Sequence, residues 1–112
     1  MKDSFLIADT MTRFLEDHKL QNVVLIDLKD KYNIADYMII ATGTSSRQIG
    51  AVAELLVMEL KSLGIKDTIV EGDATCDWVL LDSCGVIVHL FKEEMRAFYN
   101  LEALWNPEAI KQ

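Results

Sequence analysis

The chain has 112 residues, of which 51% are hydrophobic, and a formal net charge of −7 at pH 7. This length suits one domain with its own core, so we expect a single domain over residues 1–112. The acidic balance argues against contact with nucleic-acid phosphates, which needs clustered Lys and Arg, and no sequence-specific nucleic-acid binding is expected. A basic protein partner stays open, because opposite charge speeds encounter.

The two cysteines, Cys76 and Cys84, are too few for a zinc site or a disulfide framework, and we interpret both as reduced thiols. Residues 1–20 mix acidic, polar and apolar side chains, without the uninterrupted apolar core of an export signal. No apolar run reaches transmembrane length. These features predict a cytoplasmic protein without a membrane partner.

The first predicted element is an amphipathic helix that is capped by Asp3 or Ser4 and ends near Lys19. Its apolar side is formed by Ile7, Met11, Phe14, Leu15 and His18. Two strands are predicted next, over residues 22–28 and 36–42. The nearly unbroken apolarity of the second strand indicates burial on both faces.

A glycine turn then leads into a predicted helix that is capped by Thr44, Ser45 or Ser46 and ended by a C-cap glycine. Such a turn also occurs in phosphate-binding loops, because free backbone N–H groups attract anions. The segment GTSSRQIG has no second glycine and Lys-Ser/Thr pair at the spacing of a P-loop, so plain capping is favoured. Arg47 opposes the helix dipole, and we expect Asp36 to hold it.

The most continuous apolar stretch, residues 76–91, follows a short predicted strand at residues 68–71 and is interpreted as a β-hairpin with a tight turn. The length of the turn decides which side chains share a face. A two-residue turn, which is the commonest kind and suits a glycine, is favoured. It groups Trp78, Leu80, Asp82, Ile87, His89 and Phe91 on one face. A three-residue turn would instead place Trp78 and Leu80 among the aliphatic residues of the second strand.

On the favoured register the other face is purely aliphatic and is the better candidate for the core. It holds Val79, Leu81, Val86, Val88 and Leu90. A face that mixes Trp with polar tips is typical of a wet protein interface. The alternative stays open that Trp78 is ordinary core and His89 a hydrogen-bonded core histidine.

A C-terminal helix is predicted over residues 92–105, and Pro107 bars its continuation. Alternating helices and strands with one hairpin predict an α/β fold, a mixed β-sheet packed with helices. Arg96 and Tyr99, three residues apart on the last helix, are interpreted as structural or dimer-forming.

Candidate catalytic groups are scarce: the chain has two histidines and no G-x-S-x-G nucleophile elbow. A metal held by His89 with Asp82 or Cys84 would lack a paired ligand motif, and no metal or cofactor is expected. Nucleotidyl transfer is the sharper enzymatic alternative. This reaction needs two metal ions, which are held by paired acidic side chains on one strand. The acidic pair that follows the glycine turn is Glu71 and Asp73, but a glycine lies between the two acids and the predicted strand ends there.

Several separated motifs occur in an order that is similar to the ribosomal silencing factor family, also called Iojap or YbeB proteins. They are ADYMIIATGTSSRQIGAV, VEG followed by DWVLLD, VIVHLF, and RAFYNLEALW. The resemblance covers almost the whole chain and implies a fold like a nucleotidyltransferase domain without catalytic acids. It implies a non-enzymatic bacterial factor that binds the large ribosomal subunit through ribosomal protein fourteen of that subunit. Such a factor blocks joining of the small subunit and represses translation under nutrient limitation, and homodimers are implied as well.

Carried onto matching positions, the resemblance implies a site that binds the ribosomal protein and is centred on Trp78. Leu80, His89 and Phe91 surround it, and Asp82 offers a carboxylate to a basic residue opposite. One departure concerns the hairpin turn. The family commonly has Asp-Tyr-Gly-Asp where this chain has Asp82-Ser83-Cys84-Gly85, so an aromatic residue and an acid are missing at the turn. If that Tyr contacts the ribosomal protein in the family, a larger share of the contact falls here to Trp78 and its neighbours.

Overall fold

The computed structural model describes residues 3–29, 35–72, 75 and 77–99, with side chains through Arg96. In these residues five strands form one sheet in the order β1-β2-β5-β4-β3. The elements along the chain are α1 (Ser4–Asp17), β1 (Gln21–Asp27), β2 (Tyr37–Gly43), α2 (Ser46–Ser62), β3 (Ile69–Glu71), β4 (Trp78–Ser83), β5 (Val86–Lys92) and α3 (Glu93–Tyr99). Strands β2 and β5 are parallel and the other neighbours are antiparallel, which confirms the predicted mixed α/β sheet.

Both long helices begin at capping residues that the sequence indicates. The Asp3 side chain accepts a hydrogen bond from the Phe5 N–H, and the Ser45 side chain accepts one from the Gln48 N–H. These bonds satisfy donors that have no partner inside a helix. Gly64 follows the end of α2 with φ +90°, a conformation that glycine adopts at little cost.

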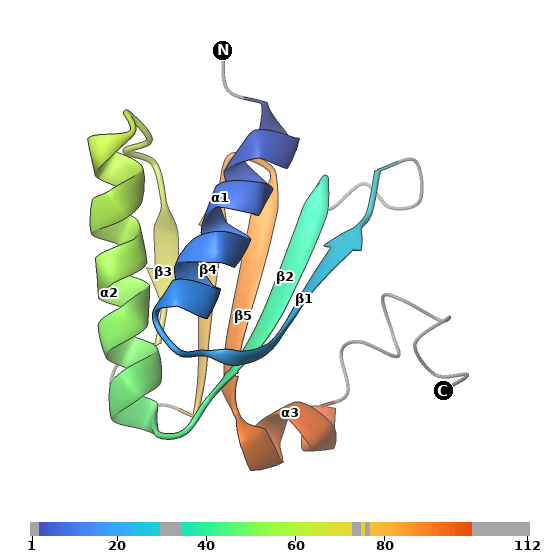
Figure 1. Ribbon diagram of the computed structural model, residues 1–112, viewed down its shortest axis with the longest axis vertical. Coiled ribbons are helices and arrows are strands. Elements are labelled where there is room, and N and C mark those ends of the chain that lie inside the picture. Colours follow the sequence, from blue (N-terminus) through green and yellow to red (C-terminus); the bar gives the residue numbers. More distant parts are fainter. Residues whose placement is uncertain (1–2, 30–34, 73–74, 76, 100–112) are drawn as a thin grey trace.

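One face of the sheet is covered by α1 and α2, which lie side by side across it (Figure 1). The apolar stripe of α1 contributes Ile7, Met11 and Leu15, and α2 contributes Ile49, Leu56 and Leu60. Every residue of β2 is buried, as the unbroken apolarity of residues 36–42 predicts. None of the described helices is both long and apolar enough to span a membrane.

The opposite face carries a smaller cluster that is covered in part by α3. The cluster consists of Ile26, Leu28, Met38, Ile40 and Phe91, with Met95 of α3 packed against it. Arg96 donates hydrogen bonds to the Asn22 carbonyl at 2.6 Å and to Thr42 Oγ1 at 2.7 Å, which confirms a structural role for this residue. The rest of the predicted C-terminal helix, and the side chain of Tyr99, lie outside the described residues. The likeness to a nucleotidyltransferase domain is not confirmed.

Candidate functional site

The turn between β4 and β5 has two residues, as the sequence favours. Ser83 pairs with Val86, and between them Cys84 and Gly85 have φ values of +52° and +81°. Two positive φ values match the twist of a tight hairpin, and a glycine at the second position lowers their cost. The Gly85 carbonyl also accepts hydrogen bonds from the Asp36 and Tyr37 N–H groups, at 2.8 and 3.1 Å. The turn is therefore held against the start of β2.

This register separates the two faces of the hairpin as predicted. The aliphatic face is completely buried under α1 and α2: Val79, Leu81, Val86, Val88 and Leu90 are all 0% exposed. On the other face Trp78 pairs with Phe91, Leu80 with His89, and Asp82 with Ile87. The prediction that the aliphatic face belongs to the core is confirmed, and a three-residue turn is excluded.

The predicted site residues differ in how far they reach the surface. Asp82 is exposed, and Trp78 and Leu80 are half-buried. His89 is only 6% exposed and Phe91 is 0% exposed. For His89 the core alternative is therefore correct, and Phe91 is core as well. Both were expected to surround Trp78 at a contact surface, but the packing against β2 and α3 places them below it.

Trp78 lies on these two buried rings. Its ring centroid is 5.1 Å from that of Phe91, with an interplanar angle of 26°. Its indole Nε1–H donates a hydrogen bond of 3.0 Å to His89 Nδ1. Burial lowers the pKa of His89 to about 4, so the imidazole is neutral near pH 7 and its Nδ1 is able to accept. The buried side of the indole is thus held by a ring contact and a hydrogen bond.

Strand β3 adds two side chains to the same face. Ile69 pairs with Asp82 and Glu71 pairs with Leu80, and Ile69 is 59% exposed. We define the hairpin face as Ile69, Glu71, Trp78, Leu80, Asp82 and Ile87. The sequence indicates a strand at residues 68–71 but does not show which strand it pairs with. The period-2 alternation of a strand is the signal that would have placed Ile69 and Glu71 on one face.

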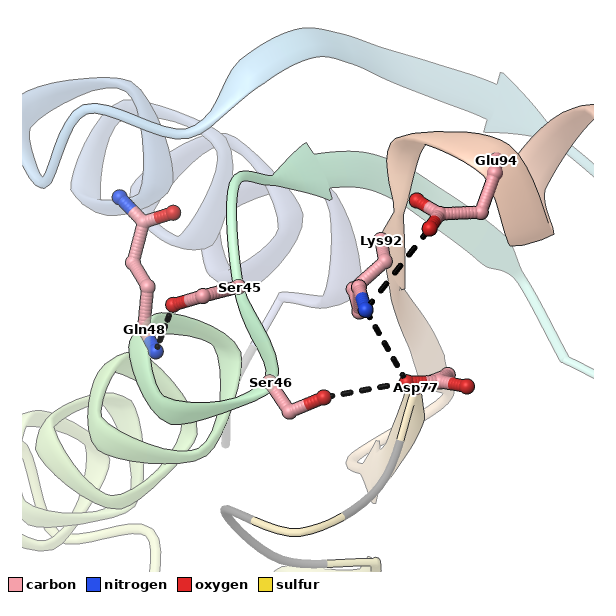
Figure 2. Close-up of polar contacts among 6 residues, drawn as sticks. All are labelled: Ser45, Ser46, Gln48, Asp77, Lys92 and Glu94. Atoms are coloured by element: carbon pink, nitrogen blue, oxygen red, sulfur yellow. Dashed lines mark hydrogen bonds and ion pairs between the residues drawn. The ribbon is translucent and has the colours of Figure 1, made fainter.

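A polar cluster lies where α2 and β4 begin and β5 ends (Figure 2). Ser46 Oγ donates to Asp77 Oδ1 at 3.1 Å, and the same carboxylate oxygen lies 3.6 Å from Lys92 Nζ. Glu94 Oε2 lies 3.7 Å from the same ammonium group. The Lys92 charge is therefore balanced by two carboxylates. These contacts connect Asp77, the residue before Trp78, to the start of α2 and to the end of β5.

The glycine turn before α2 serves packing and capping. A Cβ on Gly43 would lie 2.7 Å from Ile49 Cγ1, so only glycine lets the helix approach the strand this closely. Ser45 caps the helix, as the capping interpretation predicts. The prediction that Asp36 holds Arg47 is wrong, because Asp36 precedes β2 and Arg47 follows it, at the other end of the strand. Asp36 instead accepts a hydrogen bond from Ser4 Oγ at 2.8 Å.

Of the two cysteines, the structure describes Cys84 alone. Cys84 is a free, exposed thiol at the hairpin turn, and Cys76 lies outside the described residues. In the part of the chain that the structure describes, no three His, Cys, Asp or Glu side chains are grouped as metal ligands. A metal at His89 is disfavoured further because its Nδ1 accepts the indole hydrogen bond.

Comparison with known proteins connects this architecture to one family. The family model described as "Ribosomal silencing factor during starvation" matches residues 2–112. A ribosomal silencing factor of Zymomonas mobilis is 42% identical over 103 residues, which cover 92% of this chain and 77% of that protein. One from Haemophilus influenzae is 38% identical over 88% of this chain and 97% of its own length. A crystal structure of a Chromobacterium violaceum protein, 33% identical, superposes with a TM-score of 0.86 over 93% of this chain and 87% of that one.

Proposed function

The chain belongs to the ribosomal silencing factor family, and we propose that it binds the large ribosomal subunit through ribosomal protein fourteen of that subunit. In this proposal the bound protein blocks the small subunit sterically and represses translation in the cytoplasm under nutrient limitation. It acts by occupying a surface and catalyses no reaction. The contact is made by the hairpin face, with Trp78 as the anchor, Leu80 beside it and Asp82 facing a basic residue.

The observation that carries the proposal is the half-buried indole of Trp78, stacked on the buried Phe91 of the neighbouring strand. Interfaces concentrate their binding energy in a few aromatic anchors that lie near the centre of the contact. An anchor that is already held in one conformation loses little freedom on docking. Trp78 is half-buried, its ring is stacked on Phe91, and its Nε1–H is hydrogen-bonded to His89 Nδ1.

The charge of the hairpin face supports a basic partner. Its two ionisable side chains, Glu71 and Asp82, are both acidic and exposed, and they flank apolar side chains of β3 and β4. Acidic groups at the rim of an apolar patch attract a positively charged surface and fix its orientation. The net charge of −7 acts in the same direction at longer range.

Replacement of the anchor tests the proposal. We expect Trp78→Ala to lower the affinity for purified large subunits, measured by co-sedimentation, roughly 30-fold or more, because loss of an aromatic anchor costs about 2 kcal/mol or more. The fold should persist, since the helix-covered core is untouched. Met58→Ala is the matched control: Met58 is 63% exposed on α2, in the layer that covers the opposite face of the sheet, and its loss should leave binding unchanged.

A second variant separates contact from folding. Trp78→Phe keeps an aromatic ring on Phe91 but shortens the exposed part of the anchor, so it should fold normally and still bind less tightly. If Trp78→Ala and Trp78→Phe both sediment with large subunits as the unmodified chain does, the hairpin face is not the ribosome contact.

A further inference from the structure

Trp78 and His89 form a hydrogen-bonded pair on adjacent strands, one half-buried and the other buried. They are diagonal neighbours: Leu80 is paired with His89, and Trp78 is two residues before Leu80 on the same face. Their ring centroids are 5.6 Å apart, and the bond from Nε1 to Nδ1 is 3.0 Å long. This places the polar edge of the indole against β5.

The chemistry of the two rings allows one arrangement of protons. Indole Nε1–H can only donate, so Nδ1 of the imidazole must be the acceptor and the ring must be neutral. Its remaining proton is therefore on Nε2. Burial of His89 favours the same neutral form.

The bond also selects one orientation of the indole. The indole plane is stacked on Phe91, and a half-turn about its χ2 torsion would carry Nε1 to the other side of the Cβ–Cγ bond, away from His89. The hydrogen bond to His89 Nδ1 is made in one of these two orientations and lost in the other.

We propose that His89 is a positioning residue: its Nδ1 atom holds the Trp78 indole in the orientation that docks, and His89 itself does not touch the partner. The inference rests on the proposed function for the docking step, whereas the orientation of the indole can be measured in the isolated chain. Loss of the acceptor removes a bond that favours the docking orientation, so docking then has a larger cost in side-chain entropy.

Three replacements of His89 distinguish the effect of its hydrogen-bond acceptor from the effect of its aromatic ring. His89→Asn places an amide oxygen on Cγ, close to the position of Nδ1, and keeps an acceptor. His89→Leu has nearly the same shape as Asn but no acceptor. His89→Phe keeps an aromatic ring that can lie against Phe91 and also has no acceptor. Thermal melting by circular dichroism shows which variants are folded.

The first measurement is the indole N–H resonance of Trp78 in ¹⁵N-labelled full-length protein, assigned with the Trp78→Phe variant. We expect a downfield, slowly exchanging resonance in the unmodified chain and in His89→Asn. In His89→Leu and His89→Phe it should move upfield and exchange faster. The second measurement is affinity for purified large subunits. It should stay within about twofold in the Asn variant and fall roughly three- to tenfold in the other two, the range expected for one neutral hydrogen bond.

Each outcome of these measurements supports or contradicts the positioning role of His89. A protected indole resonance in the Leu or Phe variant would show that His89 does not hold the ring, and so would an Asn variant that behaves like Leu. An indole that is freed without loss of affinity would show that its orientation is irrelevant to docking. If the unmodified chain fails to bind large subunits, the proposed function is wrong, and the resonance then decides alone whether His89 positions Trp78.

Discussion

The two faces of the β4–β5 hairpin are built from alternate residues of the same strands, and they differ in almost every respect. The face under α1 and α2 has five aliphatic side chains with no exposed area. The hairpin face has exposed acids, the exposed Ile69 and half-buried apolar residues over a buried His-Phe pair. One face is suited to stability, and the other is suited to contact.

This difference shows how a small chain can place residues suited to stability and residues suited to contact on the same two strands. Because side chains alternate along a strand, a one-residue change in the turn would move the side chains of one hairpin strand to the opposite face and mix the two sets. The Cys84-Gly85 turn and its hydrogen bonds to the start of β2 therefore fix the chemistry of the surface as well as the hairpin. Stability effects should be concentrated on one face and binding effects on the other.

Adjacent leucines provide the sharpest test of this division. Leu81 is 0% exposed beneath the helices, and Leu81→Ala should lower the free energy of unfolding by about 2–5 kcal/mol, the usual cost of a buried Leu-to-Ala cavity. Leu80→Ala, the same change on the half-buried hairpin face, should cost about 1 kcal/mol. Urea denaturation followed by circular dichroism measures both values.

The affinity for large subunits should follow the reverse order. Under conditions in which each variant is folded, Leu80→Ala should bind less tightly and Leu81→Ala should bind as the unmodified chain does. Equal stability losses for the two variants, or weaker binding by Leu81→Ala alone, would contradict the division between the faces.

The pH dependence of stability reports on His89, a buried titratable group of the hairpin. Its pKa is lowered by burial from 6.5 to about 4, so above pH 6.5 it is neutral in both the folded and the unfolded chain. Between pH 6.5 and 4 the unfolded chain takes up a proton that the folded chain does not. The free energy of unfolding should therefore fall over this window, by up to about 3 kcal/mol, with no further loss from this group below pH 4.

The control for this titration is His89→Asn. Carboxyl groups in general also take up protons in acid, and Glu71 and Asp82 lie on the same face as His89. The Asn variant keeps both carboxylates and lacks the imidazole, so urea titrations of the two proteins from pH 7 to 4 should diverge. Parallel curves would mean that the buried imidazole does not titrate as described.

Local patterns were sufficient to predict much of the fold. The caps at Asp3 and Ser45, the two-residue turn and the buried aliphatic face all depend on neighbours within a few positions along the chain. The unbroken apolarity of residues 36–42 likewise indicated a central strand, and β2 is buried throughout. These features follow from backbone geometry and periodicity, which a sequence displays directly.

The features that were missed all depend on pairing between distant segments. Periodicity does not say that β3 pairs with β4, which brings Ile69 and Glu71 to the hairpin face. It does not say that α3 returns to cover Phe91, or that Asp36 and Arg47 lie at opposite ends of a strand. Strand order and long-range packing decided which predicted site residues reach the surface.

Reversal of a single charge gives the smallest expected change in stability. Asp82 is exposed between Ile69 and Ile87, so Asp82→Lys should alter the free energy of unfolding by no more than about 0.5 kcal/mol. If a basic surface approaches this face, the same change should slow association with large subunits roughly tenfold at low salt. The difference should shrink at about 1 M salt, where charges are screened within about 3 Å.

Glu54→Lys is the matched control, because it makes the same change in net charge on exposed α2, in the layer that covers the opposite face. Stopped-flow measurements of both variants then distinguish local complementarity from the attraction due to the net charge of −7. Equal slowing by the two variants would assign the effect to net charge. Unchanged rates for Asp82→Lys would remove electrostatic steering from the hairpin face and leave docking to its apolar contacts.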